Sequence, residues 1–240
     1  MTSLITFDLD NTLWDVDSVI VAAEQSMRAW LREHVPEVVD LYNSNGLTEI
    51  RTQVLSNHPE LKHNLSALRV LITQKAIESC GHGSASAERL ARKAFDVFMD
   101  GRHQVNYFED ALTTLATLSR SYMLAALSNG NADITRLGLD RYFSFAYSAA
   151  EVGRGKPHPD MFLAALERTG TRPEGAVHIG DHLDDDIAGA QGVGMHTIWV
   201  DLTRKGLPEG AIRPTRIVHA LREIPAAISS INQSGAGVCA

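Results

Sequence analysis

The chain has 240 residues, 44% of them hydrophobic and 21% charged, which is the balance of an ordinary globular protein. A formal net charge of -7 and the absence of a basic stripe from the sequence argue against nucleic-acid binding. The sequence has no apolar run of membrane-spanning length and no secretory leader pattern, and its two cysteines have neither metal-binding nor redox spacing. We therefore expect a cytoplasmic protein without a membrane or nucleic-acid partner.

The chain opens with a short apolar run that leads into two aspartates, Asp8 and Asp10. Residues 4–7 fit a buried strand of a parallel sheet, and the carboxyl ends of such strands form the ligand-binding edge. Carboxylates this close repel each other unless a cation lies between them, so the pattern indicates a carboxylate dyad or a divalent-metal site. In isolation a plain turn is the alternative. A calcium loop is excluded because the position that requires glycine is Leu13.

The next part of the chain has the pattern of helices. Apolar residues recur at helical spacing over 20–35, 65–77 and 90–98, and residues 48–55 favour a further helix. No strand pattern interrupts residues 16–104. This stretch predicts an all-helical block.

Strand and helix patterns alternate from residue 109 onward. Helices are predicted over 109–119, 132–139, 160–167, from 187, and over 221–231; strands are predicted over 122–127, 143–149, 176–179, 195–200 and 216–220. This alternation predicts an α/β fold with a Rossmann-like parallel sheet. We expect residues 1–15 and 105–232 to form this core domain, residues 16–104 to form a helical cap domain inserted after the first strand, and residues 233–240 to form a flexible tail.

A parallel sheet would bring further polar groups to the edge that holds the first two aspartates. They are Ser128, Asn129, Lys156, Asp181 and the run Asp184-Asp185-Asp186. Each has a plain structural explanation: a turn and helix cap, an exposed loop lysine, or acidic residues at a helix start. Together, a hydroxyl, a lysine and at least three carboxylates predict a site for Mg²⁺ and a phosphoryl group, where a carboxylate can act as nucleophile. The side chains and backbone N–H groups of residues 128–130 are suited to hold an anion.

Four stretches resemble the motifs of a known family. They are Asp8-Leu9-Asp10-Asn11-Thr12, Leu127-Ser128-Asn129, Lys156-Pro157, and Gly180-Asp181 followed by Asp186. In order and placement they resemble the four motifs of the haloacid dehalogenase-like (HAD) hydrolases, and the helical insert resembles the C1 cap of that superfamily. The doubled aspartate is typical of the phosphatases, whereas the haloalkanoate dehalogenases lack the second one. The resemblance therefore implies a phosphoric monoester hydrolase and disfavours dehalogenation.

The resemblance also implies roles for individual residues. Asp8 would attack phosphorus and form an aspartyl-phosphate, while Asp10 would protonate the leaving alkoxide and then deprotonate the hydrolytic water. Ser128 and Lys156 would hold the phosphoryl oxygens. The predicted Mg²⁺ ligands are Asp8, the main-chain carbonyl of Asp10, and Asp181. Asp186 would orient Lys156 or a metal-bound water, and the variable positions Asp184 and Asp185 are assigned no chemistry.

A narrower resemblance concerns the substrate. Thr12–Asp15, Ser128–Asn131, Leu137–Leu139 and Gly153–Pro157 resemble the YigB-type branch of these phosphatases, although Trp14 and Gly155 replace an expected tyrosine and serine. That branch is associated with FMN and 5-amino-6-(5-phosphoribitylamino)uracil, and so with riboflavin metabolism. The alternatives are a nucleoside monophosphate of the 5'-nucleotidase type or a sugar phosphate. A phosphomutase, and a non-catalytic scaffold that binds a ligand or partner, stay open, as does the oligomeric state.

Three further side chains raise hypotheses with a plain alternative beside them. Trp14 could stack on an aromatic leaving group, but a core or hinge aromatic is the better interpretation. Arg51 and Arg69 could reach a substrate from the cap, yet a solvated helix face is favoured for both. The sequence does not decide whether Arg154 contacts ligand.

Overall fold

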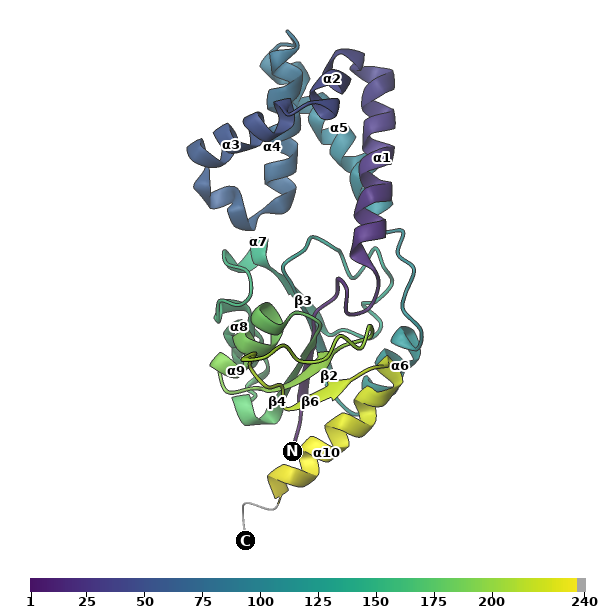
Figure 1. Ribbon diagram of the computed structural model, residues 1–240, viewed down its shortest axis with the longest axis vertical. Helices are drawn as coiled ribbons and strands as arrows, with labels where there is room; N and C mark the ends of the chain where they lie inside the picture. Colours follow the sequence, from purple (N-terminus) through teal and green to yellow (C-terminus); the bar gives the residue numbers. More distant parts are fainter. Residues whose placement is uncertain (237–240) are drawn as a thin grey trace. The chain divides into compact units, whose positions relative to one another are not determined.

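The computed structural model describes residues 1–236, and within them the chain forms one parallel sheet of six strands (Figure 1). The strand order is β3-β2-β1-β4-β5-β6. The strands are β1 (Leu4–Phe7), β2 (Met123–Ser128), β3 (Phe145–Ser148), β4 (Ala176–Gly180), β5 (His196–Val200) and β6 (Arg216–Val218). All neighbouring strands pair in parallel, so the predicted α/β class is confirmed. The first strand lies centrally, between the second and the fourth.

Helices cover both faces of the sheet, which explains why β1 is apolar and buried along its whole length. On one face α8 (Asp160–Thr169) and α9 (Gly189–Gly192) pack with β2, β3 and β5, and on the other α6 (Ala111–Leu118) meets α10 (Ile224–Ala236). Shorter elements are α7 (Ala149–Val152) and the turns η3 (Pro173–Gly175), η4 (Leu183–Ala188) and η5 (Leu221–Glu223). The element η4 is a π-helical turn directly after β4, at the carboxyl edge of the sheet.

The inserted block is helical throughout. It consists of α1 (Val16–His34), η1 (Pro36–Val38), α2 (Val39–Asn43), α3 (Gly46–Asn57), η2 (Pro59–His63), α4 (Leu65–Ser79) and α5 (Ser84–Arg102). Its core is a cluster that includes Met27, Leu31, Ile77 and Phe98. Helix α1 packs closely on α5. Glycine at position 101 permits this approach, since an added Cβ atom would lie 2.9 Å from the Ala23 Cα. None of the described helices is long and apolar enough to cross a bilayer.

The contacts divide the chain into two compact units. One unit comprises Met1–Asp15 and the chain from Asn106 onward, and the other comprises Val16–Val105. The cap boundaries that we propose from sequence, residues 16–104, lie close to this division. Helix α10 continues to Ala236, so the first part of the expected tail is helical and residues 237–240 lie outside the described part of the chain.

The helix predicted over residues 132–139 is wrong, because the structure has turns there. The Asp133 carboxylate accepts the backbone N–H of Thr135 at 2.7 Å, a local bond that competes with helical hydrogen bonding. Gly138 then adopts a left-handed conformation with φ of 65°. Likewise α6 starts at Ala111 rather than at residue 109, since Asp110 has a φ of 64°.

Candidate active site

The first aspartate lies directly beyond β1 and is almost fully buried. The Asp8 backbone N–H donates to the Ile179 carbonyl at 2.8 Å, which continues the β1–β4 pairing past the end of the strand. The chain then turns back, with Asn11 at a φ of 61° and its N–H bonded to the Trp14 carbonyl at 2.8 Å. This tight turn places Asp8 and Asp10 at the same edge of the sheet.

The second aspartate is held by a tryptophan. The Trp14 indole Nε1–H donates to Asp10 Oδ1 at 2.9 Å, and the ring packs edge-on against Tyr107 with centroids 5.8 Å apart. Trp14 is fully buried. These contacts favour the core-aromatic interpretation over a stacking contact with substrate, and they give Trp14 the function of fixing the Asp10 carboxylate.

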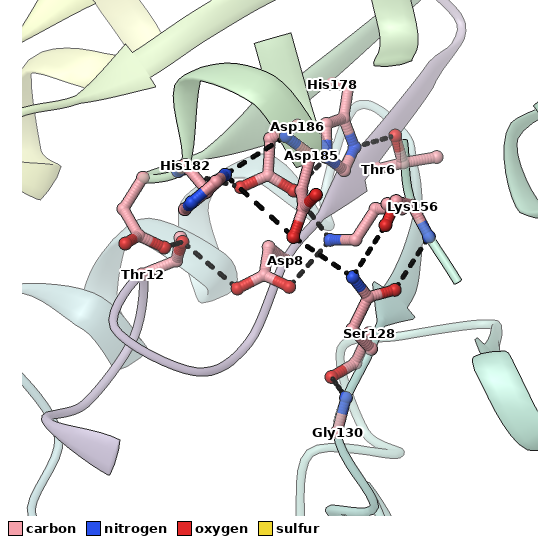
Figure 2. Close-up of polar contacts among 12 residues, drawn as sticks. Thr6, Asp8, Thr12, Ser128, Gly130, Lys156, His178, His182, Asp185 and Asp186 are labelled. Atoms are coloured by element: carbon pink, nitrogen blue, oxygen red, sulfur yellow. Dashed lines mark hydrogen bonds and ion pairs between the residues drawn. The ribbon is translucent and has the colours of Figure 1, made fainter. Parts of the chain in front are cut away.

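A buried lysine joins two carboxylates at the centre of the site (Figure 2). The Lys156 Nζ donates to Asp8 Oδ1 at 2.7 Å and to Asp186 Oδ1 at 2.6 Å, and its side chain is 1% exposed. Burial by itself would lower the pKa of Lys156, but the charges of Asp186 and Asp8 outweigh burial and raise it. These surroundings favour the charged ammonium, and Asp186 holds it through the 2.6 Å bond. Whether Asp186 acts on Lys156 or on a metal-bound water during catalysis stays a prediction.

Two buried residues that the sequence analysis did not single out extend this network. His178 Nε2 lies 3.1 Å from Asp186 Oδ1, and its Nδ1 lies 2.7 Å from the Thr6 hydroxyl (Figure 2). Burial lowers the pKa of His178, so we assign the neutral ring with Nε2–H donating to Asp186 and Nδ1 accepting from Thr6. The only signal in the sequence is a histidine in the otherwise apolar run of β4.

The side chain of Asn129 is committed to the loop that carries the lysine. Its Nδ2 donates to the Lys156 carbonyl at 2.9 Å, and its Oδ1 accepts the Lys156 backbone N–H at 2.7 Å. Nδ2 also lies 3.2 Å from Asp185 Oδ2. At Gly155 a Cβ atom would lie 2.7 Å from the Asn129 Oδ1, so glycine permits this close approach. Contact between the Asn129 side chain and phosphate stays a prediction, and its observed bonds position Lys156.

Ser128 is the hydroxyl residue of the site. Its Oγ accepts the Gly130 backbone N–H at 3.0 Å, which leaves the hydroxyl proton as a donor (Figure 2). Both residues line the cavity at the carboxyl edge of the sheet. A hydroxyl donor beside an ammonium is suited to hold oxygens of a phosphoryl group.

Three carboxylates meet at a point suited to a cation. Oxygens of Asp8, Asp181 and Asp186 lie within 4.8 Å of one another. Burial, and then the charge of Asp186, raises the pKa of Asp181 to about 6. Burial likewise raises the pKa of Asp8 despite the opposing effect of Lys156. This crowding of negative charge beside one ammonium fits a divalent cation such as Mg²⁺, which would favour the ionised carboxylates.

Within this set the direct ligands can be ranked by their existing bonds. Asp186 uses Oδ1 for Lys156 and His178, and its Oδ2 accepts the His182 backbone N–H at 3.0 Å. Asp181 accepts the Thr12 hydroxyl at 3.0 Å through Oδ1 alone. Asp8 accepts one bond at each oxygen, from Lys156 at Oδ1 and from Thr12 at Oδ2 over a longer 3.4 Å. Asp181 and Asp8 thus keep more lone pairs than Asp186, and we predict them as the ligands and Asp186 as the supporting group. The Asp10 carbonyl as a ligand stays a prediction.

A cavity of about 160 Å³ unites the site. All seven predicted side chains line it: Asp8, Asp10, Ser128, Asn129, Lys156, Asp181 and Asp186. Asn11, Gly130, His182 and Asp185 complete the lining, so Asp185 belongs to the site although the sequence analysis gave it no role. Arg154 is exposed and is not among the lining residues.

Comparison with known proteins identifies the family. The family model of the haloacid dehalogenase-like hydrolases matches residues 2–194. The 5-amino-6-(5-phospho-D-ribitylamino)uracil phosphatase YigB of Escherichia coli is 31% identical over 82% of this chain and 83% of its own length, and a Thermus thermophilus phosphoserine phosphatase is 34% identical over 65% and 63%. A crystal structure titled 2-haloacid dehalogenase, from Pseudomonas syringae, is 42% identical with a TM-score of 0.90 over 96% of this chain and 99% of that one.

The chain belongs to the haloacid dehalogenase-like hydrolases. The two curated relatives carry phosphatase names, and on these comparisons the prediction of a phosphoric monoester hydrolase is confirmed.

We predict that Asn129→Ala lowers kcat about 10- to 100-fold, because the Lys156 backbone loses both of its bonds to this side chain and the ammonium shifts. Steady-state kinetics with a phosphate monoester and circular dichroism of the folded variant would measure this. Asn57→Ala, at an exposed position of α3, is the control and should not change kcat. Equal kcat values for the two variants would contradict a positioning role for Asn129.

We predict that His178→Ala lowers the free energy of unfolding by about 2–4 kcal/mol, because it opens a buried space and removes a donor to the buried Asp186 carboxylate. Urea unfolding would measure it. His196→Ala, at the half-buried start of the neighbouring strand, should change stability by less than about 1 kcal/mol. A similar loss in both variants would show that the His178 contacts add no stability of their own.

Proposed function

We propose that the protein is a Mg²⁺-dependent phosphatase that hydrolyses a small phosphorylated metabolite through an aspartyl-phosphate at Asp8. The observation that carries this proposal is the placement of the Asp8 carboxylate against the Lys156 ammonium, 2.7 Å away, in a cavity that also holds Ser128 and Asp181. A nucleophile, two donors for phosphoryl oxygens and a second carboxylate for a cation are thus within one small space. Phosphoryl transfer needs little beyond such positioning and charge neutralisation.

The two aspartates divide the chemistry. An Asp8 oxygen attacks phosphorus while the bond to the leaving alkoxide breaks, and Asp10 gives that alkoxide its proton. Water then attacks the phosphorus of the aspartyl-phosphate, Asp10 takes the proton from this water, and inorganic phosphate leaves as Asp8 is regenerated. The Trp14 N–H bond keeps the Asp10 carboxylate in place for both proton transfers.

Asp8, Asp181 and the Asp10 main-chain carbonyl would hold Mg²⁺. When bound, the cation supplies positive charge that removes the repulsion between a carboxylate nucleophile and a phosphate dianion. Lys156 alone cannot supply this charge, since Asp186 and Asp8 already share it. The Thr12 hydroxyl donates to Asp181 and so helps to hold this carboxylate in place.

Dehalogenation is the second candidate because of the Pseudomonas syringae structure at 42% identity, whose title names a 2-haloacid dehalogenase. The same attack by Asp8 could occur at carbon. A halide, however, leaves without a proton, so a fixed general acid at Asp10 has no use in that step. We therefore favour phosphate ester cleavage, where the leaving alkoxide requires a proton.

For the substrate, the first candidates are flavin-pathway monophosphates: FMN and 5-amino-6-(5-phospho-D-ribitylamino)uracil. The 31% identity with YigB over most of both chains supports them, together with the loop motifs that resemble that branch. Nucleoside monophosphates and sugar phosphates are the next candidates. Formation of an isomerised sugar phosphate would instead indicate a phosphomutase. Location in the cytoplasm and the absence of a nucleic-acid or membrane partner stay predictions.

We predict that Asp8→Asn lowers phosphate release by about 10³-fold or more, because the amide cannot act as the nucleophile. Malachite-green assays with Mg²⁺ and with EDTA would measure it, and EDTA should abolish wild-type activity in the same way. Asp184→Asn is the matched control, since Asp184 is an exposed carboxylate that does not line the cavity. Chloride release from 2-chloropropionate without phosphatase activity would instead establish a dehalogenase, and no turnover of either kind would favour a non-catalytic scaffold.

We predict that a panel of phosphorylated metabolites gives the highest kcat/KM for one of the flavin-pathway monophosphates. Both candidates combine a ribityl phosphate with a heterocycle, so each should exceed a plain sugar phosphate by at least about tenfold if the heterocycle is bound. Phosphate release under matched Mg²⁺ concentrations would measure the ranking. A flat profile or a preference for nucleotides would leave the phosphatase chemistry standing and remove the flavin assignment.

A further inference from the structure

The helical cap contains a cavity of its own, with a volume of about 250 Å³. Side chains from α1, α2, α3 and α4 line it, and all of them belong to the unit Val16–Val105. Its polar lining includes Glu24, Arg28, Tyr42, Arg51, Arg69 and Thr73. The proposed reaction uses none of these residues, so the cavity requires a separate explanation.

The charges in this lining are unbalanced. One of the three guanidinium groups, that of Arg69, pairs with Glu24 and lies over the Phe98 ring, 3.8 Å from its centroid. The ion pair and the stacking together fix Arg69 as a structural group. Within residues 1–236 no carboxylate forms an ion pair with Arg28 or Arg51, so the cavity keeps two excess positive charges. A recess with charge of one sign attracts a ligand of the opposite sign.

The remaining polar groups are already arranged. The Arg28 guanidinium lies over the Tyr42 ring, 5.4 Å from the centroid. The Tyr42 hydroxyl lies 3.3 Å from the hydroxyl oxygen of the buried Thr73, so one of the two donates to the other and the second keeps a proton for another acceptor. The cavity thus offers a hydroxyl donor beside its cationic groups.

The other part of the lining is apolar. Met27 and Leu68 are buried, and the half-buried Ile72 lies one turn further along α4. A fully inorganic anion would leave this surface without a partner, whereas an anion with an apolar body would cover it. The volume lies just below the usual range for ligand pockets, which fits a small group of about the size of one substituted ring.

We propose that this cavity is a binding site for a small organic carboxylate, whose carboxylate group is held by Arg51 and Arg28 and whose apolar body packs on Met27, Leu68 and Ile72. Guanidinium groups bind carboxylates with two parallel hydrogen bonds, which makes this pairing stronger than one with a neutral carbonyl. A flavin or uracil ring offers carbonyl acceptors without a full charge and therefore suits this cavity less well. The flavin-pathway substrate candidates have no carboxylate on their leaving groups, so the ligand is an effector separate from the substrate. Its binding does not rest on the proposed function.

The direct test is calorimetric titration of the full-length protein with benzoate at low ionic strength. We expect saturable binding, with benzamide, which has nearly the same shape but no charge, at least tenfold weaker. Arg51→Gln should weaken benzoate binding at least tenfold. Arg51 is exposed, so this variant should fold, whereas Arg69 packs on Phe98 and is unsuited to the test.

Arg92→Gln is the matched control for loss of charge. Arg92 is an exposed arginine of α5 that pairs with Glu88 and does not line the cavity, so benzoate binding should be unchanged. The proposal is overturned if benzoate shows no saturable binding, if benzamide binds equally well, or if Arg51→Gln and Arg92→Gln bind benzoate as the wild type does.

Kinetics with para-nitrophenyl phosphate test whether the ligand acts as an effector. Free benzoate should alter the rate at which the wild type hydrolyses this ester and leave the rate of Arg51→Gln unchanged. Equal wild-type rates with and without saturating benzoate would overturn the effector assignment. Absent hydrolysis of the ester would count against the proposed function alone, because the benzoate titration does not depend on turnover.

Discussion

The buried ammonium of Lys156 is the interaction on which the site depends. It joins Asp8, which follows the first strand, to Asp186, which lies in the π-helical turn after the fourth. Removing one partner from a buried ion pair leaves an uncompensated charge that costs several kcal/mol, so each of the three groups requires the other two. The lysine therefore fixes the relative positions of segments that are far apart in the sequence.

The parallel register of the sheet makes this arrangement possible. Thr6 and His178 are direct partners across β1 and β4, and for that reason the hydroxyl reaches the imidazole and the imidazole reaches Asp186. A Cβ atom at Gly180 would overlap the carboxyl group of Asp186, so glycine at the end of β4 lets the turn fold back onto the strand. The pairing of two strands thus positions a carboxylate several residues beyond them.

Much of this site follows from the sequence, because strand ends in a parallel sheet must meet at one edge. That rule alone brings Asp8, Lys156 and Asp181 together. It does not reveal His178, since a histidine inside an apolar strand looks like any core residue until its partner across the sheet is known. Nor does it reveal that the Asn129 amide holds the Lys156 backbone, because the conformation of a loop is not encoded in the spacing of its residues. The helix prediction over 132–139 was wrong for a related reason, because the Asp133 carboxylate accepts the Thr135 backbone N–H and this local bond replaces the helical pattern.

The two carboxylates on Lys156 differ in how strongly their surroundings favour the ionised form. Burial opposes ionisation of both, but Lys156 and His178 outweigh it at Asp186 and lower the pKa of that carboxyl, while the pKa of Asp8 is raised. Asp186 is thus the fixed counter-ion, and Asp8 is the group whose charge a further cation would stabilise. An ammonium has three N–H donors, and two of them point to these carboxylates. In the proposed reaction only the third would be left for a phosphoryl oxygen, so the network that anchors Lys156 would limit it to a single bond with the substrate.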